Sequence, residues 1–109
     1  MDDTRALKVS TTTDTVELAG QLAQSALAAT LAGGAEVIGP VDAYSWHEGE
    51  AVRQPEWRVT FTTTAAGYPA LEAHLRAGHV WDNPEITAVP VVAASQDYLA
   101  WLERTVTPV

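Results

Sequence analysis

Apolar and polar residues alternate along four stretches of the chain, and this alternation predicts β-strands. Successive side chains of a strand point to opposite faces of a sheet, so one buried face gives an apolar residue at every second position. β-Branched and aromatic residues are frequent in these stretches, as they are in strands generally. The predicted strands are Ala6–Thr13, Ala35–Trp46, Val52–Thr64 and Glu85–Ala93.

Between the first two strands the apolar spacing changes to that of a helix. Asp14 is a suitable N-cap, and Glu17 three positions later completes a capping-box pattern. The helical spacing stops at Gly33-Gly34, and glycine is the residue most often found just after a helix. We therefore expect the first helix to run from Asp14 to this glycine pair.

Two more helices are predicted in the second half of the chain. Pro69 suits the first turn of a helix that ends at Gly78, because the N–H that proline lacks would be unpaired there. Ser95 is a suitable cap for a last helix. The resulting order, β-α-β-β-α-β and then a short helix, is that of a ferredoxin-like α+β sandwich. We expect one such domain over residues 1–109.

Two of the predicted strands are apolar on both faces. In the fourth strand Ala88 and Val92 fall on one side, whereas Val89 and Val91 fall on the other. An antiparallel sheet with one face in water alternates instead. The second and third predicted strands form a hairpin and have about twelve residues each, roughly twice the usual length. Because exposed edges and bare apolar faces are normally covered, we expect the chain to form a closed homo-oligomer.

Charge and composition narrow the possible partners. Six Lys and Arg against fourteen Asp and Glu give a net charge of −8, which argues against nucleic acid and anionic membranes as partners. The absence of cysteine excludes disulfides, thiolate metal sites and thiol catalysis. The start of the chain lacks the basic and apolar segments of a secretion signal, and no apolar stretch is long enough to span a membrane. A cytoplasmic location is expected.

Motifs that would indicate an enzyme are missing. The sequence has no glycine-rich phosphate loop, no GxSxG elbow and no HExxH helix. Ser10 and Ser45 have no obvious base beside them. Glu48 and Glu50 lie in the predicted hairpin turn, where carboxyl groups stay solvated and gain no catalytic pKa shift. We therefore expect a protein that is not an enzyme.

Several short motifs, taken in order, are similar to those of one known family. They are Thr11-Thr12-Thr13, Tyr44-Ser45-Trp46, Glu56, the loop His79-Val80-Trp81-Asp82-Asn83-Pro84-Glu85-Ile86, and Tyr98-Leu99-Ala100-Trp101. From Ala6 to about Arg104 the chain resembles the CutA divalent-cation tolerance proteins. The resemblance implies a ferredoxin-like homotrimer, similar in layout to PII signalling proteins. It also implies a loosely defined role in tolerance of divalent metals such as copper.

The chain departs from the family at positions near the expected ligand site. Gly33-Gly34 stands where the family often carries cysteine, so no thiolate role in copper binding carries over. Thr62 replaces a lysine of the third strand, and His79-Val80-Trp81 replaces His-Pro-Tyr.

Ligand contacts are expected in clefts between subunits, at Glu56, Thr62, Trp81 and Glu85. His79 and Glu85 are the candidate ligands of a copper or zinc ion, because imidazole and carboxylate groups suit these metals. The alternative is that His79 forms local hydrogen bonds and Glu85 satisfies amide groups of the loop. His79 is the histidine that the family motif supports.

The remaining histidines and tryptophans have simpler interpretations. His74 is expected to be a solvated or half-buried helix residue, and His47 to lie in the solvated turn of the hairpin. Trp46 and Trp57 are expected to serve subunit packing, because tryptophan favours interfaces. Trp101 is expected to close the last helix against the sheet.

Three functions remain open on this reading. The leading one is a trimeric CutA-like protein that binds a metal ion or small molecule, or regulates through it. The second is a rigid trimer that docks a partner protein, for which the net charge of −8 favours a basic partner. The third is an enzyme subunit whose old cleft has been repurposed.

Overall fold

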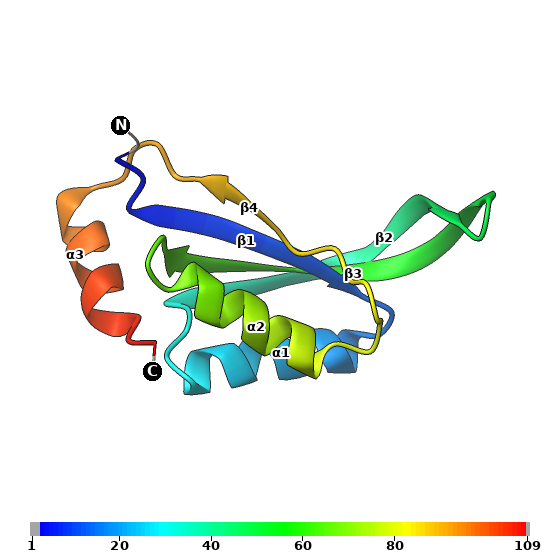
Figure 1. Ribbon diagram of the computed structural model, residues 1–109, viewed down its shortest axis with the longest axis horizontal. Coiled ribbons are helices and arrows are strands. Elements are labelled where there is room, and N and C mark those ends of the chain that lie inside the picture. The colour runs from blue at the N-terminus through cyan, green and yellow to red at the C-terminus, as the bar shows by residue number, and fades with distance from the viewer. Residues whose placement is uncertain (1–2, 109) are drawn as a thin grey trace.

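The computed structural model describes residues 3–108, in which helices cover one face of a four-stranded antiparallel sheet (Figure 1). The order of the strands across the sheet is β2-β3-β1-β4. The predicted α+β class and the predicted order of elements are both confirmed. The elements are β1 Ala6–Thr13, α1 Val16–Ala28, β2 Gly34–His47, β3 Glu50–Thr64, α2 Tyr68–Gly78, β4 Thr87–Pro90 and α3 Gln96–Thr105.

The main core lies between the sheet and helices α1 and α2. Val9 of β1 pairs with Phe61 of β3, and residues paired in this way share one face of the sheet. Both side chains are fully buried, and they pack against apolar residues of the two helices. These helix residues are Ala19, Leu22, Ala26, Leu71 and Leu75. Burial of this one face fixes the register of the sheet.

Helix α1 begins one residue later than the capping pattern predicts. Its N-cap is Thr15, whose Oγ1 accepts a hydrogen bond from the N–H of Leu18 at 3.1 Å. Asp14 therefore lies outside the helix, and the prediction that it is the cap is wrong. Threonine and aspartate cap by the same geometry, so residue type alone does not determine which of these two adjacent residues takes the position.

The end of α1 also differs from the prediction. The helix stops at Ala28, and Thr30 then adopts a positive φ of 57°, a conformation that a β-branched residue rarely takes. Oγ1 of Thr30 donates to the carbonyl oxygen of Thr107 at 3.0 Å, and the N–H of Thr107 donates to that of Thr30 at 2.9 Å. The C-terminal segment thus holds the turn, and Gly34 is the first residue of β2 instead of a helix stop.

The other helix boundaries agree with the sequence pattern. Pro69 lies in the first turn of α2, and Gly78 is its last residue. The Ser95 side chain caps α3 by accepting from the N–H of Tyr98 at 3.3 Å. Helix α3 closes the end of the sheet with a small cluster of its own, in which Leu102 packs with Ala6.

Strand β4 is shorter than predicted and contains only four residues. Its last pair joins Pro90 to Leu7 near the start of β1, and proline has no N–H to continue the ladder. Val91 adds one more hydrogen bond, to the carbonyl oxygen of Ala6 at 3.0 Å, before the chain leaves the sheet. The apparent two-sided apolar pattern therefore includes residues beyond the strand, such as Val92, which is 94% exposed.

The sheet face opposite α1 and α2 is polar at its centre. Nζ of Lys8 donates to Oγ1 of Thr62 at 2.7 Å, and the hydroxyl groups of Ser10 and Thr60 lie 3.3 Å apart. The expectation of a bare apolar face is thus wrong for the middle of the sheet. Exposed apolar side chains occur beside this centre, at Val89, Ile38 and the outer part of the hairpin.

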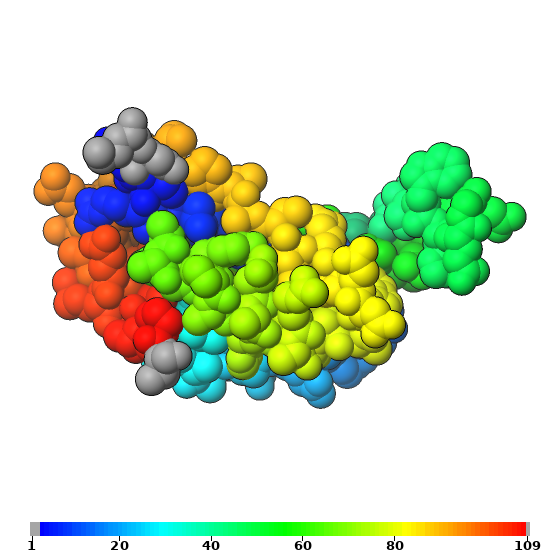
Figure 2. Space-filling view, in the orientation of Figure 1, coloured from blue at the N-terminus to red at the C-terminus, as the bar shows by residue number. Residues whose placement is uncertain are grey.

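Residues 41–55 form the outer part of the β2–β3 hairpin, which we call the arm. Strand pairing continues from Val41↔Glu56 to His47↔Glu50, and a turn at Glu48-Gly49 closes the hairpin. Both turn residues have positive φ, as in a type I′ hairpin turn. The arm extends beyond the helices (Figure 1), and in the space-filling view it forms a lobe separate from the body (Figure 2).

A bulge at Gly39-Pro40 separates the arm from the rest of the sheet. A Cβ atom built on Gly39 would lie 2.5 Å from the indole ring of Trp57 and 3.0 Å from its Cα. Only glycine fits this close approach. Trp57 itself packs against the main core, on the same face as Val59 and Phe61.

Candidate functional site

A cleft of about 720 Å³ lies between the arm and the loop that follows α2. We call it the arm cleft. It brings together three of the four residues predicted to bind a ligand, Glu56, Trp81 and Glu85. The full lining consists of Thr12, Ser45, Trp46, His47, Val52, Gln54, Glu56, Trp81, Asp82, Asn83 and Glu85.

The register of the hairpin determines which arm residues face the cleft. Val41 pairs with Glu56, and Ser45 pairs with Val52. Glu56, Gln54 and Val52 are alternate residues of β3, so their side chains lie on the same face of the sheet, the one away from α1 and α2. Glu56 is the most enclosed of them, with 9% of its surface exposed. Its Oε2 accepts a hydrogen bond from Nε2 of Gln54 at 3.2 Å.

His79 fixes the conformation of the loop on the other side of the cleft. Its Nε2 donates to the carbonyl oxygen of Thr12 at 2.8 Å, and its Nδ1 accepts from the N–H of Trp81 at 3.1 Å. Because a carbonyl only accepts and an amide N–H only donates, these bonds define a neutral imidazole with the proton on Nε2. The rings of His79 and Trp81 also lie 5.2 Å apart. Metal binding by His79 would require one of these hydrogen bonds to break.

Glu85 lies at the rim of the cleft in an ion pair. Its Oε2 is 3.3 Å from Nη1 of Arg58, and it also accepts a hydrogen bond from Oγ1 of Thr87 at 3.4 Å. Both charged side chains are partly exposed, so this pair orients Glu85 more than it stabilises the fold. Arg58 therefore offsets part of the negative charge at the rim.

Thr62 is the predicted ligand residue that does not line the arm cleft. It is buried in β3, between Gly34 of β2 and Lys8 of β1. Its hydroxyl accepts the hydrogen bond from Lys8, which is the lysine of the neighbouring strand. The resemblance placed this position by motif alone, and it could not reveal that a cross-strand lysine occupies the hydroxyl.

The other two histidines each lie beside a polar side chain. Nε2 of His74 is 2.9 Å from Oγ of Ser25 on the surface of α1. His47 is exposed at the tip of the arm, 3.9 Å from Glu48. Among residues 3–108, no group of three or more His, Asp and Glu side chains is close enough to hold a metal ion.

Gln54 was not predicted as a lining residue, although the two-residue turn sets the register that places it in the arm cleft.

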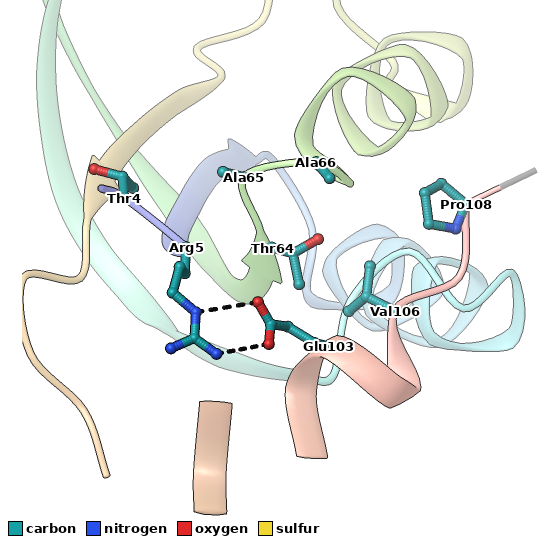
Figure 3. A pocket seen from close by; sticks show the side chains of 8 residues that line it. All are labelled: Thr4, Arg5, Thr64, Ala65, Ala66, Glu103, Val106 and Pro108. Carbon is teal, nitrogen blue, oxygen red and sulfur yellow. Dashed lines mark hydrogen bonds and ion pairs between the residues drawn. The ribbon is translucent and has the colours of Figure 1, made fainter. Parts of the chain in front are cut away.

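A second hollow of about 390 Å³ lies at the opposite end of the sheet (Figure 3). Arg5 and Glu103 form a bidentate pair beside it, with Nη2 of Arg5 2.7 Å from Oε1 of Glu103. The hydrogen bond from Arg5, together with its charge, holds the pKa of Glu103 below its usual value. None of the residues predicted to bind a ligand lies in this hollow.

The chain matches known proteins along most of its length. Residues 7–105 match the family described as CutA1 divalent ion tolerance protein. The divalent-cation tolerance protein CutA of Pectobacterium atrosepticum is 34% identical over 90 residues, which cover 81% of this chain and 76% of that protein. The chloroplastic protein CutA 1 of Oryza sativa is 28% identical over 89 residues, which cover 82% of this chain and half of that protein.

Solved structures give the same result for the fold. The crystal structure of CutA1 from Oryza sativa superposes with a TM-score of 0.91 at 26% identity, and the match covers 95% of each chain. No helix within residues 3–108 is long and apolar enough to cross a membrane. The family match covers residues 7–105, and both the relative that is 34% identical and the solved structure agree with it. The chain therefore belongs to the CutA1 divalent ion tolerance family.

Proposed function

We propose that the chain acts in divalent-cation tolerance as a homotrimeric binding protein, with the arm cleft as its ligand site. The observation that carries this proposal is the meeting of Glu56, Trp81 and Glu85 in one cleft. These residues come from β3 and from a loop more than twenty positions later in the chain. Such convergence of a few polar groups and an aromatic ring is typical of small-molecule sites.

The exposed aromatic residues of the arm support assembly into an oligomer. Tyr44 and Trp46 expose 72% and 79% of their surfaces, and Ile38 near the base of the arm exposes 60%. A soluble monomer rarely leaves such a group of large apolar side chains in water. Because Trp46 also lines the arm cleft, a second copy packed against the arm would help to enclose a ligand. The number of three comes from the CutA resemblance.

The donor groups of one chain do not fit a copper or zinc centre. Both ring nitrogens of His79 are engaged in hydrogen bonds, and Glu85 is paired with Arg58. Transition metals of this kind prefer three or four donors held together, one or more of them imidazole. The predicted metal role of His79 and Glu85 therefore stays a prediction, and we propose no chemical step that depends on a metal held by one chain.

Calorimetric titration and sedimentation test the proposal together. The full chain is titrated with copper, zinc and nucleotides, and Glu56→Gln, Trp81→Leu and His79→Ala are titrated in parallel. We expect sedimentation to show three copies, and the cleft variants to weaken whichever ligand binds. A monomer at micromolar concentration, or binding curves unchanged in all three variants, would contradict the trimer or the cleft respectively.

A platform for a partner protein is the second candidate function. The net charge of −8 favours a basic partner by electrostatic steering, and the arm offers exposed aromatic residues for docking. Affinity capture from the native extract distinguishes this function, since a partner retained equally by the Glu56→Gln variant needs no ligand in the cleft. We propose a binding protein over an enzyme, and a cytoplasmic location.

A further inference from the structure

Glu56 is a buried acid with no cation beside it. It is 9% exposed, and its one side-chain hydrogen bond within residues 3–108 comes from the amide of Gln54, which donates to Oε2. Oε1 receives no hydrogen bond from these residues, although it belongs to the lining of the arm cleft. A largely enclosed carboxylate whose one hydrogen-bond donor is neutral is stabilised by a cation that enters the cleft from outside the chain.

The chain's own cations near the arm cleft are already paired. Arg58 forms its ion pair with Glu85, and Nη2 of Arg53 lies 3.2 Å from Oδ1 of Asp42. Neither arginine is within ion-pair distance of Glu56. The carboxylate of Glu56 therefore differs from those of Glu85 and Asp42, which an arginine neutralises.

Two indole rings give the cleft the walls that an organic cation needs. Trp46 lines it near the tip of the arm, five residue pairs from Glu56. Trp81 lines it from the opposite loop, where the hydrogen bonds of His79 hold it in place. Indole has the aromatic face that attracts ammonium and guanidinium groups most strongly. Asp82 adds a further acid to the lining.

These features favour an organic cation over a metal ion. A bare ion needs several donors at short distance, and residues 3–108 contain no group of three acids and histidines arranged for one. Ammonium and guanidinium groups need one carboxylate and an aromatic face. The volume of about 720 Å³ also leaves room for a molecule larger than an ion.

We propose that the arm cleft binds a small organic cation that carries an ammonium or guanidinium group. In this complex Glu56 is the counter-ion, the ring of Trp81 lies against the charged group, and Trp46 contacts the rest of the molecule further along the arm. The inference rests on the proposed function only in taking the arm cleft as the ligand site. It does not depend on the number of subunits or on a metal.

The test is an NMR titration of the full chain with spermidine and, separately, agmatine at constant ionic strength. The chain has four tryptophans, so its indole N–H signals report on four places at once. We expect the signals of Trp46 and Trp81 to move and those of Trp57 and Trp101 to stay, because only the first pair lines the cleft. Uniform movement of all four signals, or none up to millimolar concentration, overturns the proposal.

Matched variants separate a specific site from general attraction to an acidic protein. Glu56→Gln keeps the size of the side chain and removes its charge, and we expect the affinity for spermidine to fall about tenfold or more. Glu36→Gln removes the same charge from an exposed position of β2 outside the cleft, and should change affinity less than twofold. Trp81→Leu gives a second, charge-neutral test, with an expected loss of severalfold. Equal losses in Glu56→Gln and Glu36→Gln would show attraction by net charge only and would refute the site.

Copper and zinc titrations of the same samples distinguish this proposal from the wider one. If either metal, and neither amine, binds with dependence on Glu56, the cleft remains the ligand site and the organic-cation proposal is wrong. If no titrant depends on Glu56 or Trp81, both proposals fail. Amine binding that depends on Glu56 supports the organic-cation proposal and the arm cleft as the ligand site, whatever the oligomeric state.

Discussion

Strands β2 and β3 run through both the body of the molecule and its arm, but different interactions order the two regions. In the body, Val59 and Phe61 of β3 are fully buried beneath the helices. In the arm, the same sheet continues with Tyr44 and Trp46 largely in water. The body is thus stabilised by the burial of apolar side chains, whereas the arm is ordered by strand pairing and by any molecule that packs against it. The body thus carries an exposed aromatic surface on the arm, with the arm cleft at the junction between the two regions.

The largest expected difference between the two regions is in their response to loss of an aromatic ring. Phe61→Ala should lower the free energy of unfolding by about 3–5 kcal/mol, because it opens a cavity in the main core. Trp46→Ala removes a ring that is 79% exposed, and should act through assembly alone.

Urea unfolding followed by circular dichroism at several chain concentrations checks this. The Phe61→Ala loss should be present at every concentration, and the Trp46→Ala loss should change with concentration. If Trp46→Ala proves as damaging as Phe61→Ala at every concentration, the arm is part of the folded core and the comparison is wrong.

The junction between arm and body should be sensitive to a single methyl group. Gly39→Ala places a Cβ against both the ring and the backbone of Trp57, and overpacking of this kind costs about 1–3 kcal/mol. Gly34→Ala is the matched control in the same strand, because nothing lies within 4 Å of its added Cβ. Urea unfolding measures both, and a Gly39→Ala variant as stable as Gly34→Ala would show that the junction yields easily.

The sequence predicted the elements of the fold better than their ends. Alternation and helical spacing depend on neighbours in sequence, so strands, helices and their order could be read directly. The end of α1 could not, because Thr30 is held in its left-handed turn by Thr107, 77 residues away. The length of β4 was likewise decided by where β1 offers partners and where Pro90 interrupts the ladder.

The candidate site was predictable where it follows a motif and not where it depends on pairing. The motifs placed Glu56, Trp81 and Glu85 in one site, and the structure brings these three together. Thr62 was assigned by the same method, yet its hydroxyl is taken by Lys8 across the strands. Gln54 enters the cleft through hairpin register, which motifs do not describe. Long-range contacts therefore account for what was missed.

Removal of a buried hydroxyl group from the body should have a smaller effect on stability, and this effect should be an increase. Oγ1 of Thr11 is buried and has no hydrogen-bond partner among the described residues. Thr11→Val keeps the shape of the side chain and removes this group, so it should raise stability by about 1 kcal/mol. Thr63→Val is the control, because Oγ1 of Thr63 donates to the carbonyl oxygen of Leu31 at 2.7 Å and its loss should destabilise by a similar amount. Thermal unfolding compares the pair, and equal signs would contradict the assignment of Thr11.

The smallest expected effect concerns the end of the body furthest from the arm, where Arg5 pairs with Glu103 (Figure 3). The pKa of Glu103 is lowered in the folded chain, so its contribution to stability is present above the usual pKa of 4.5 and is lost as pH falls through the folded value. Glu103→Gln should therefore lower the melting temperature slightly at pH 7, where the pair is charged, and this difference should shrink as the pH falls below 4.5. Added salt should reduce the pH 7 difference, because both groups are solvated. Glu36→Gln removes an exposed acid that has no ion pair within residues 3–108, and it is the matched control for the loss of one negative charge. A Glu103→Gln effect that keeps its size as the pH falls would show that packing, and not charge, links α3 to β1.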